Sequence, residues 1–331
     1  MKRGTGLTAL ASVTMLMSTG CGPNAGQQVS AEDYPEQNIE MVVGFGAGGH
    51  NDSVARKFAE GLSEELGERV LVVNREGGGG AIAATEAAHA APTGYEVLFA
   101  PTGAFTATML QQDVAYEIDH FRSIIPLAEN TFIIAVPANS PFETFEDLIE
   151  ADGRVVFSAF GEGHQTHVVG EGIGREYDLD AEVVAYPGSP PALQSVVNGE
   201  VDFGVQDVTS AMPRIESGEL RALAVTTDYV PDALEELSPG VPSIADYDLE
   251  RYMTAGSQGL VVPSDVPEEI VSKLEDASEK VIESEEYVEF IENSGSVIPD
   301  VGGEEWFGRY VPGEHERFRT LYDELGIPYE S

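Results

Sequence analysis

Glycine-rich segments follow five of the apolar runs in this sequence, and each can bring backbone N–H groups close to a ligand. They occupy residues 44–52, 74–80, 101–104, 158–167 and 186–190. Glycine carries no Cβ, so its backbone approaches a bound molecule closely, and a helix that follows points its positive end at the same place. The pattern therefore predicts a site for an organic anion, built mainly from main-chain donors.

The first loop, residues 44–49, matches the G-x-G-x-x-G pattern of dinucleotide-binding folds. Such folds place an acidic residue at the end of the second strand, for the ribose hydroxyls, and here that strand ends at Asn74 and Arg75. Arg75 would suit a 2′-phosphate, so a dinucleotide site is one alternative to a general anion site. In the general interpretation, Asn51 or Asp52 caps the helix that follows. The candidate contacts here are Ala47, Gly48, Gly49, Asn51 and Asp52.

Two histidines and a serine dominate the fourth loop. His164 and His167 lie three residues apart, with Glu162 and Glu171 close by, and such a set could ligate a metal. Because a Gly-x-Gly precedes them, we instead expect a loop that enters a helix, with His164 facing the ligand and His167 packing or capping. Ser158 follows a strand, but neither a G-x-S-x-G elbow nor a neighbouring base marks it as a nucleophile.

A carboxylate follows the apolar run at residues 201–205. Asp207 stands near the carboxyl end of that predicted strand, where ligands bind in α/β folds. It either contacts an amino or hydroxyl group of a ligand or makes a hydrogen bond at a hinge. We predict no cofactor, no metal site and no catalytic residue. The candidate contacts beyond the first loop are Thr102, Ser158, Gly163, His164, Gln165, Tyr186 and Asp207.

The elements that must position these loops alternate along the chain. Apolar residues at a spacing of four predict a helix over 53–66, an alanine-rich stretch predicts one over 80–90, and 266–291 predicts a long amphipathic helical region. Strand–helix alternation indicates an α/β fold with mostly parallel sheets. The predicted strands are residues 39–45, 70–74, 97–100, 132–137, 155–160, 183–186, 201–205, 220–226 and 259–263.

Charge excludes one large class of function. The chain has 331 residues, with 58 Asp and Glu against 17 Lys and Arg, which gives a net charge of −41. Such a surface repels phosphate backbones, so a nucleic-acid binder is excluded. Self-repulsion of this size is relieved when salt screens it. The composition therefore suggests a halophilic acidic surface and a high-salt habitat.

The N-terminus has the pattern of a secretion signal. Lys2 and Arg3 precede a short apolar run at residues 7–17, and small residues lead to Cys21, the single cysteine of the chain. This arrangement is similar to a bacterial lipoprotein cleavage site, where the cysteine takes a lipid; the alternative is a plain signal peptide with an incidental cysteine. We expect residues 1–21 to be the signal, Cys21 the lipid anchor and 22–33 a tether.

An ordered set of motifs resembles the solute-binding receptors of tripartite tricarboxylate transporters, the Bug-type receptors. The set runs in the family's order across roughly residues 34–328. Four positions depart from the pattern: Asn51 and His164 stand where Ser or Thr is common, Glu76 where Pro is common, and Pro187 where Lys is common. The matching motifs are YP at 34–35, GGxxDxxxR at 48–56, NRxGxGG at 74–80, GY at 94–95, GxGxxxH at 161–167, YxG at 186–188, NGxVD at 198–202, GxLRALAVT at 218–226 and GVPS at 240–243.

This resemblance implies a two-lobed α/β fold of the second periplasmic-binding-protein type, with the ligand in the cleft between the lobes. It implies lobe one at residues 34–136 and 252–331, lobe two at 137–251, and crossings near Pro137 and within 228–252. It also implies a small carboxylate ligand, such as a di- or tricarboxylate, an amino acid or an aromatic acid, and permease subunits in the membrane as partners.

The sequence is therefore interpreted as an extracytoplasmic solute-binding receptor, monomeric and lipid-anchored, that captures a small carboxylate by hinge closure and does no catalysis. The alternative is a secreted α/β enzyme, a hydrolase or a nucleotide-dependent protein, acting on a carboxylic ester or a nucleotide.

Overall fold

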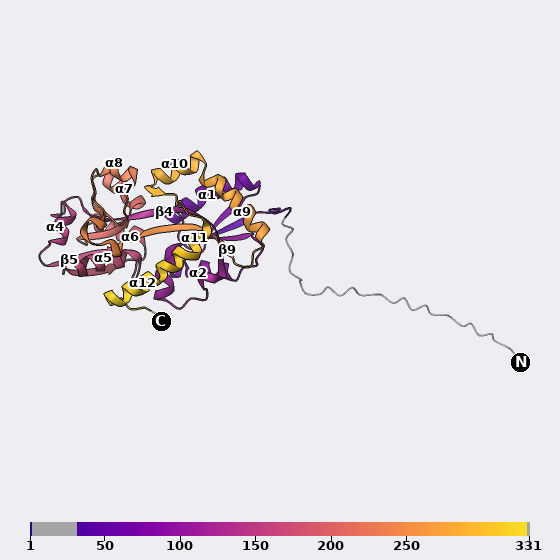
Figure 1. The fold of residues 1–331 in the computed structure, drawn as a ribbon, viewed down its shortest axis with the longest axis horizontal. Coiled ribbons are helices and arrows are strands. Elements are labelled where there is room, and N and C mark those ends of the chain that lie inside the picture. Colours follow the sequence, from indigo (N-terminus) through magenta and orange to yellow (C-terminus); the bar gives the residue numbers. More distant parts are fainter. Residues whose placement is uncertain (2–31, 330–331) are drawn as a thin grey trace.

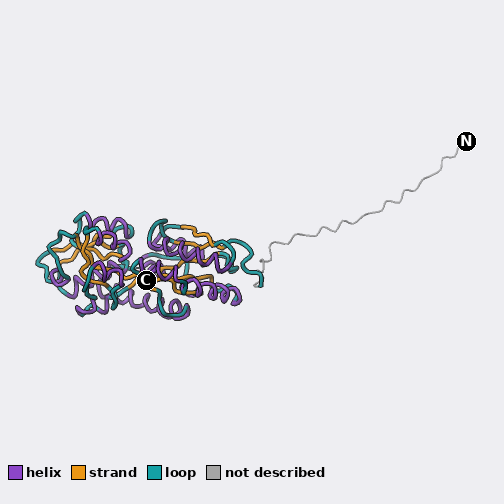
Figure 2. Tube along the Cα trace, turned by 90° about the horizontal axis from the view of Figure 1, so that it is seen from above, coloured by secondary structure: helices purple, strands orange, loops and turns teal. Residues whose placement is uncertain are grey.

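The computed structural model describes Met1 and residues 32–329, and these form two α/β lobes that lie side by side (Figures 1 and 2). The predicted signal, lipid-anchor Cys21 and most of the predicted tether therefore lie outside the described residues. One mixed sheet of ten strands runs through both lobes. Within the described residues, no helix combines the length and the apolar character needed to cross a membrane.

Helices surround this sheet on both faces (Figure 1). The strands are β1 (Ile39–Val43), β2 (Val70–Asn74), β3 (Glu96–Pro101), β4 (Phe121–Pro137), β5 (Arg154–Ala159), β6 (Asp180–Ala185), β7 (Phe203–Asp207), β8 (Leu220–Val225), β9 (Ala255–Pro263) and β10 (Ser296–Val297). The helices are α1 (His50–Leu66), α2 (Ala81–Ala88), α3 (Ala107–Gln111), α4 (Phe145–Ile149), α5 (Gln165–Glu176), α6 (Ser189–Val197), α7 (Val208–Glu216), α8 (Asp232–Leu237), α9 (Glu268–Ile282), α10 (Glu285–Asn293), α11 (Gly303–Glu305) and α12 (Val311–Leu325).

Lobe one is built on the strand order β2-β1-β3-β9-β4. β1 is parallel to β2 and β3, whereas β9 is antiparallel to β3 and β4. One apolar cluster under α1 and α9 includes Phe58, Leu62 and Leu274, and a second around α2 includes Phe105 and Trp306. Burial on both faces explains why these strands are almost wholly apolar.

Lobe two continues the sheet with β4, β7, β5 and β6, and β8 pairs with β4 on its own. β5 is parallel to β6 and β7, so the carboxyl ends of these three strands lie at one edge. The sequence prediction of mostly parallel sheets needs correction, because the strands that join the lobes are antiparallel. These antiparallel pairings form where the chain passes from one lobe to the other. Local sequence patterns do not show where the chain makes that passage.

The strand β4 belongs to both lobes. Its first part pairs with β9 as far as Thr131, and its second part pairs with β7 from Phe132 onward. The chain therefore changes lobe between Thr131 and Phe132, ahead of the predicted crossing at Pro137, which instead ends the strand. The return crossing reaches lobe one at Ala255, which pairs with Thr131. Both crossings thus lie next to each other at the hinge.

The C-terminal helix α12 corrects the predicted lobe boundary. Residues 252–331 were all expected in lobe one, but Phe318, Leu321 and Tyr322 are buried in the main core of lobe two. The start of α12 stays with lobe one, where Val311 joins the cluster around α2. A helix that spans both lobes is visible in yellow in Figure 1.

The amphipathic region predicted over 266–291 is two helices rather than one. α9 ends at Ile282, and Ser284 begins α10 by accepting a hydrogen bond from the N–H of Tyr287 at 3.3 Å. Serine competes for backbone hydrogen bonds and is favoured at helix starts, which explains the break.

Candidate functional site

The start of α1 presents backbone donors at the cleft side of lobe one. The first i to i−4 hydrogen bond of the helix runs from the N–H of Ser53 to the carbonyl of Gly49, at 3.0 Å. The preceding N–H groups, of His50, Asn51 and Asp52, therefore have no partner within the helix. The positive end of α1 follows the loop after β1, and a helix start of this kind is able to accept an anion.

The prediction that Asn51 or Asp52 caps this helix is wrong. Gly49 is the N-cap residue and no side chain caps it, so neither Asn51 nor Asp52 has the expected role. Asp52 is buried and reaches back along the loop instead. Its carboxylate accepts hydrogen bonds from the N–H of Gly48 at 2.8 Å, from Arg56 Nε at 2.9 Å and from Asn74 Nδ2 at 2.9 Å.

The contacts of Asp52 fix the shape of the glycine loop. Burial opposes ionisation of this carboxyl group, but the hydrogen bonds from Arg56, Gly48 and Asn74 outweigh it and hold its pKa below the ordinary value. The ionised form therefore persists and holds Gly48 in place, where a φ of +83° suits glycine alone. Asp52 thus shapes the anion site through its hydrogen bonds to the loop.

A buried polar row runs from Thr102 along the start of β9 to β4. The N–H of Ser257 donates to Thr102 Oγ1 at 3.4 Å, and Gln258 Nε2 donates to Asn130 Oδ1 at 2.7 Å. Gln258 is 3 % exposed, and its Oε1 has no hydrogen-bond partner. Of these residues, only Thr102 was predicted from the sequence. A polar side chain directly before the apolar run 259–263 is the signal that could have pointed to Gln258.

Lobe two contributes a matching polar pair at the carboxyl ends of its parallel strands. Ser158, on β5, accepts a hydrogen bond from Gln206 Nε2 at 2.9 Å, and both side chains are fully buried. A Cβ on Gly204 would lie 2.5 Å from each of these two atoms, so the pair requires glycine there. Gln206 Oε1 has no partner. Ser158 is bonded to an amide rather than to a base, which argues against a nucleophile.

His164 caps α5 and packs between aromatic rings. Its Nδ1 accepts the N–H of Thr166 at 3.2 Å, and its ring lies 5.3 Å from that of Phe160 and 6.2 Å from that of Phe132, measured between centroids. Burial lowers the pKa of His164 to about 4, which the charge of Asp207 only partly offsets. His164 is therefore neutral at pH 7.

The loop before His164 is hydrogen-bonded within lobe two and lies close to lobe one. The N–H of Gly163 donates to His167 Nδ1 at 2.9 Å, and its carbonyl accepts the hydroxyl of Tyr322. A Cβ on Gly163 would meet Gln111 of lobe one at 2.2 Å. His167 thus packs and caps as expected. Gln165 points to the hinge, where its Nε2 donates to Thr254 Oγ1 at 3.1 Å.

Asp207 ends β7 and caps α7. It is 5 % exposed, and its Oδ1 accepts the N–H of Ser210 at 2.8 Å while Oδ2 accepts the hydroxyl of Ser189. Its strand neighbour is Phe132, the first residue of lobe two on β4. Tyr186 lies at the end of β6, partly exposed, with its N–H on the carbonyl of Ala159 at 2.9 Å. Asp207 therefore lies beside the hinge.

His50 connects the two halves of the site. This residue begins α1 in lobe one, yet its protonation responds to the charge of Asp207 in lobe two. Burial lowers the pKa of His50, and Asp207 and the adjacent amide of Gln258 oppose the shift. Its buried Nε2 has no hydrogen-bond partner among the described residues. His50 was not predicted as a site residue, because no motif pairs it with another residue.

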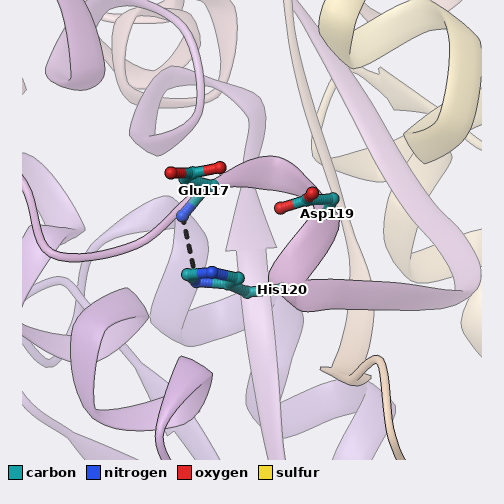
Figure 3. A group of neighbouring side chains, drawn as sticks. All are labelled: Glu117, Asp119 and His120. Carbon is teal, nitrogen blue, oxygen red and sulfur yellow. Dashed lines mark hydrogen bonds between the residues drawn. The ribbon is translucent and has the colours of Figure 1, made fainter.

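Two other groups of residues are not part of this cleft. Glu117, Asp119 and His120 bring candidate metal-ligand atoms within 4.8 Å of one another, but His120 Nδ1 already accepts the N–H of Glu117 at 3.2 Å as a helix cap (Figure 3). A recess of about 350 Å³ lies behind the hinge, with Glu129, Asp228 and other acids on its walls. Arg251 and Arg317 also line this recess, and none of the predicted contact residues does.

A family model for the tripartite tricarboxylate transporter family receptor matches residues 54–327. The chain belongs to this family. As a receptor of this family, it is similar to the protein BugT of Bordetella pertussis, with 26 % identity over 90 % of this chain and 92 % of the relative. It is also similar to a UPF0065 protein from the tcbD–tcbE intergenic region of a Pseudomonas species, with 30 % identity over 96 % and 94 % of the two chains.

Solved structures agree with this assignment. The periplasmic binding protein BugD aligns with a TM-score of 0.78 and 26 % identity, covering 89 % of this receptor and 99 % of BugD. A protein of R. palustris solved with adipate aligns with a TM-score of 0.80 and 26 % identity, over 89 % and 99 % of the two chains. The two-lobed periplasmic-binding fold is thereby confirmed, and the receptor is an extracytoplasmic solute-binding protein rather than an enzyme.

Proposed function

We propose that this receptor captures a small carboxylate in the cleft between its lobes and releases it to the permease of a tripartite tricarboxylate-type transporter. The observation that carries the proposal is the first turn of α1. Its first N–H groups have no partner within the helix, and Asp207, at the end of β7 in lobe two, lies close enough to affect the protonation of His50, the first residue of α1. The relative solved with adipate supports a carboxylate as the ligand class.

The hinge supports closure around the ligand. Both crossings are single extended segments that meet at Thr131 and Ala255, so the lobes can rotate with few changes in backbone conformation. A ligand that contacts both lobes binds the closed form more tightly and shifts the population toward it. Closure hides the carboxylate from water, and main-chain donors then hold it without a cationic side chain.

The direct experiment is a thermal-shift screen at high salt over mono-, di- and tricarboxylates and aromatic acids, followed by calorimetric titration of each hit. A ligand that binds only the folded state raises the melting temperature, by an amount that corresponds to about 2.7 kcal/mol at a hundredfold excess over Kd. Gly49→Pro, which places a ring at the mouth of the donor turn, should abolish the response. Gly302→Pro, far from the cleft, is the control. The proposal is refuted if no carboxylate stabilises the receptor.

We also propose attachment to the membrane through a lipid on Cys21. The support is the sequence pattern that precedes this residue. Expression of the full chain in a bacterium, with radiolabelled fatty acid, should label the wild type and leave Cys21→Ser unlabelled. Equal absence of label from both chains, with the protein still exported, would show a plain signal peptide.

A further inference from the structure

His50 lies in the turn that we propose as the anion site. It is the first residue of α1, and its N–H has no partner within the helix, because the first i to i−4 hydrogen bond is donated by Ser53. An anion that accepts the free donors of this turn therefore lies next to His50. The first cationic residue of the helix, Arg56, is already paired with Asp52 at 2.9 Å. The turn thus combines main-chain donors with the titratable ring of His50.

Two buried polar atoms beside this turn have no hydrogen-bond partner among residues 32–329. One is Nε2 of the His50 ring, and the other is Oε1 of Gln258, a side chain that lies next to that ring and is 3 % exposed. The Gln258 amide is fixed in orientation, because its own Nε2 donates to Asn130 Oδ1 at 2.7 Å and to the carbonyl of Gly256 at 3.1 Å. Buried polar atoms are normally paired, and a proton on Nε2 of His50 lets the ring donate to Oε1 of Gln258.

Asp207 of lobe two is the charged group that acts on this ring. Among the described residues, its carboxylate is the one charge that raises the pKa of His50, and burial of the ring lowers that pKa by more. Without a ligand, His50 is therefore neutral at pH 7. A carboxylate bound at the α1 turn places a second negative charge beside the same ring. An opposite charge within about 4–6 Å favours the charged form of a titratable group, so the bound anion favours the imidazolium form of His50.

We infer that His50 supplies the positive charge of the anion site, by taking up a proton as the carboxylate binds. This inference rests on the proposed function and concerns how the same turn holds its ligand. The imidazolium ring attracts the carboxylate, donates to Gln258 and is attracted by Asp207 of lobe two. The main-chain donors then need no permanently charged side chain beside them, and the empty receptor avoids the cost of burying an uncompensated cation. Because Asp207 and His50 belong to different lobes, the new charge also favours the closed form when ligand is present.

Calorimetric titration in two buffers counts the protons that binding takes up. The probes are adipate, succinate and benzoate, joined by any other hit of the carboxylate screen, and the buffers are PIPES and imidazole, which differ in ionisation enthalpy. The difference in binding enthalpy between the buffers gives the proton uptake at each pH. Between pH 7.5 and pH 6.5, the wild type should take up a fraction of a proton that grows toward one as the pH falls. Its affinity should then rise by up to about tenfold per pH unit.

A variant assigns the proton to His50. His50→Gln keeps the backbone N–H of the turn but cannot take up a proton, so it should bind about tenfold more weakly at pH 6.5, with an affinity that no longer depends on pH. His89→Gln, which replaces an exposed histidine of lobe one, should match the wild type.

Two results overturn the inference and leave the proposed function intact. One is carboxylate binding with equal proton uptake by the wild type and His50→Gln. The other is read from the wild type alone and does not depend on the folding of a variant: an NMR pKa of the assigned His50 ring that does not rise when the carboxylate is added. If no carboxylate of the screen binds, the proposed function itself is refuted.

Discussion

Replacement of His164 by Asn should make the receptor more resistant to acid. Asn keeps a side-chain acceptor for the N–H of Thr166, and it is a good N-cap residue. The variant therefore retains the start of α5 but loses the only titratable group at that position. Its effect on stability isolates the protonation of one partly buried ring.

The magnitude follows from the pKa of His164. Burial lowers this pKa from 6.5 to about 4, so between these values the unfolded chain binds a proton that the folded chain does not. The stability of the wild type is complete above pH 6.5 and falls as the pH drops toward 4. Because one pKa unit corresponds to about 1.4 kcal/mol, the wild type should lose about 2 to 3 kcal/mol relative to His164→Asn between pH 7 and pH 4.5.

Urea unfolding of both proteins from pH 7 to pH 4.5, at constant high salt, measures this difference directly. His89→Asn, which replaces an exposed histidine of lobe one, should follow the wild type at every pH. Histidine NMR resonances assigned with the same variants give the pKa of His164 independently. Parallel stability profiles for wild type and His164→Asn, or an NMR pKa near 6.5, would refute the argument that burial keeps this ring neutral.

Three further outcomes are expected. Gly204→Ala should destabilise the fold by about 1–3 kcal/mol because its Cβ displaces Gln206, whereas Gly313→Ala in α12, with open space around it, should be neutral or slightly stabilising; urea unfolding compares the two. Asp52→Ala should cost about 2–3 kcal/mol and abolish ligand-induced thermal shifts, since Gly48 loses its anchor; normal ligand shifts in a folded variant would contradict this. The melting temperature should rise from dilute buffer to molar KCl, because a charge of −41 is then screened within about 3 Å; equal values would remove the halophilic interpretation.

The sequence predicted the strands of each lobe well, because a buried strand is a short apolar run between glycine-rich turns. It predicted β2 at 70–74 with the same bounds as the structure, and it detected only the second half of β4. The first half includes Arg122, Pro126 and Glu129, which interrupt the apolar pattern. β4 passes between two lobes, so its two halves face different surroundings and no single periodicity describes it.

Candidate site residues could be predicted where a local sequence motif marks them. They could not be predicted where only long-range strand pairing brings them together. Ser158 lies near the end of an apolar run, and the structure places it on β5 and Asp207 at the end of the parallel-sheet strand β7, with His164 in the loop after β5. His50 and Gln258 come close only because β9 returns from lobe two and pairs with β3. That pairing joins residues far apart in the chain, and the polar pattern within either segment alone gives no sign of it.

The path of α12 constrains how the receptor can open. Near its start, His315 lies 3.2 Å from the carbonyl of Phe105 in lobe one, whereas near its end Glu324 forms an ion pair with Arg251 and accepts from Arg175 of lobe two. The helix α12 therefore connects the two lobes in addition to the two hinge strands. We therefore expect the lobes to open about an axis near α12, because the two ends of this helix are bonded to different lobes.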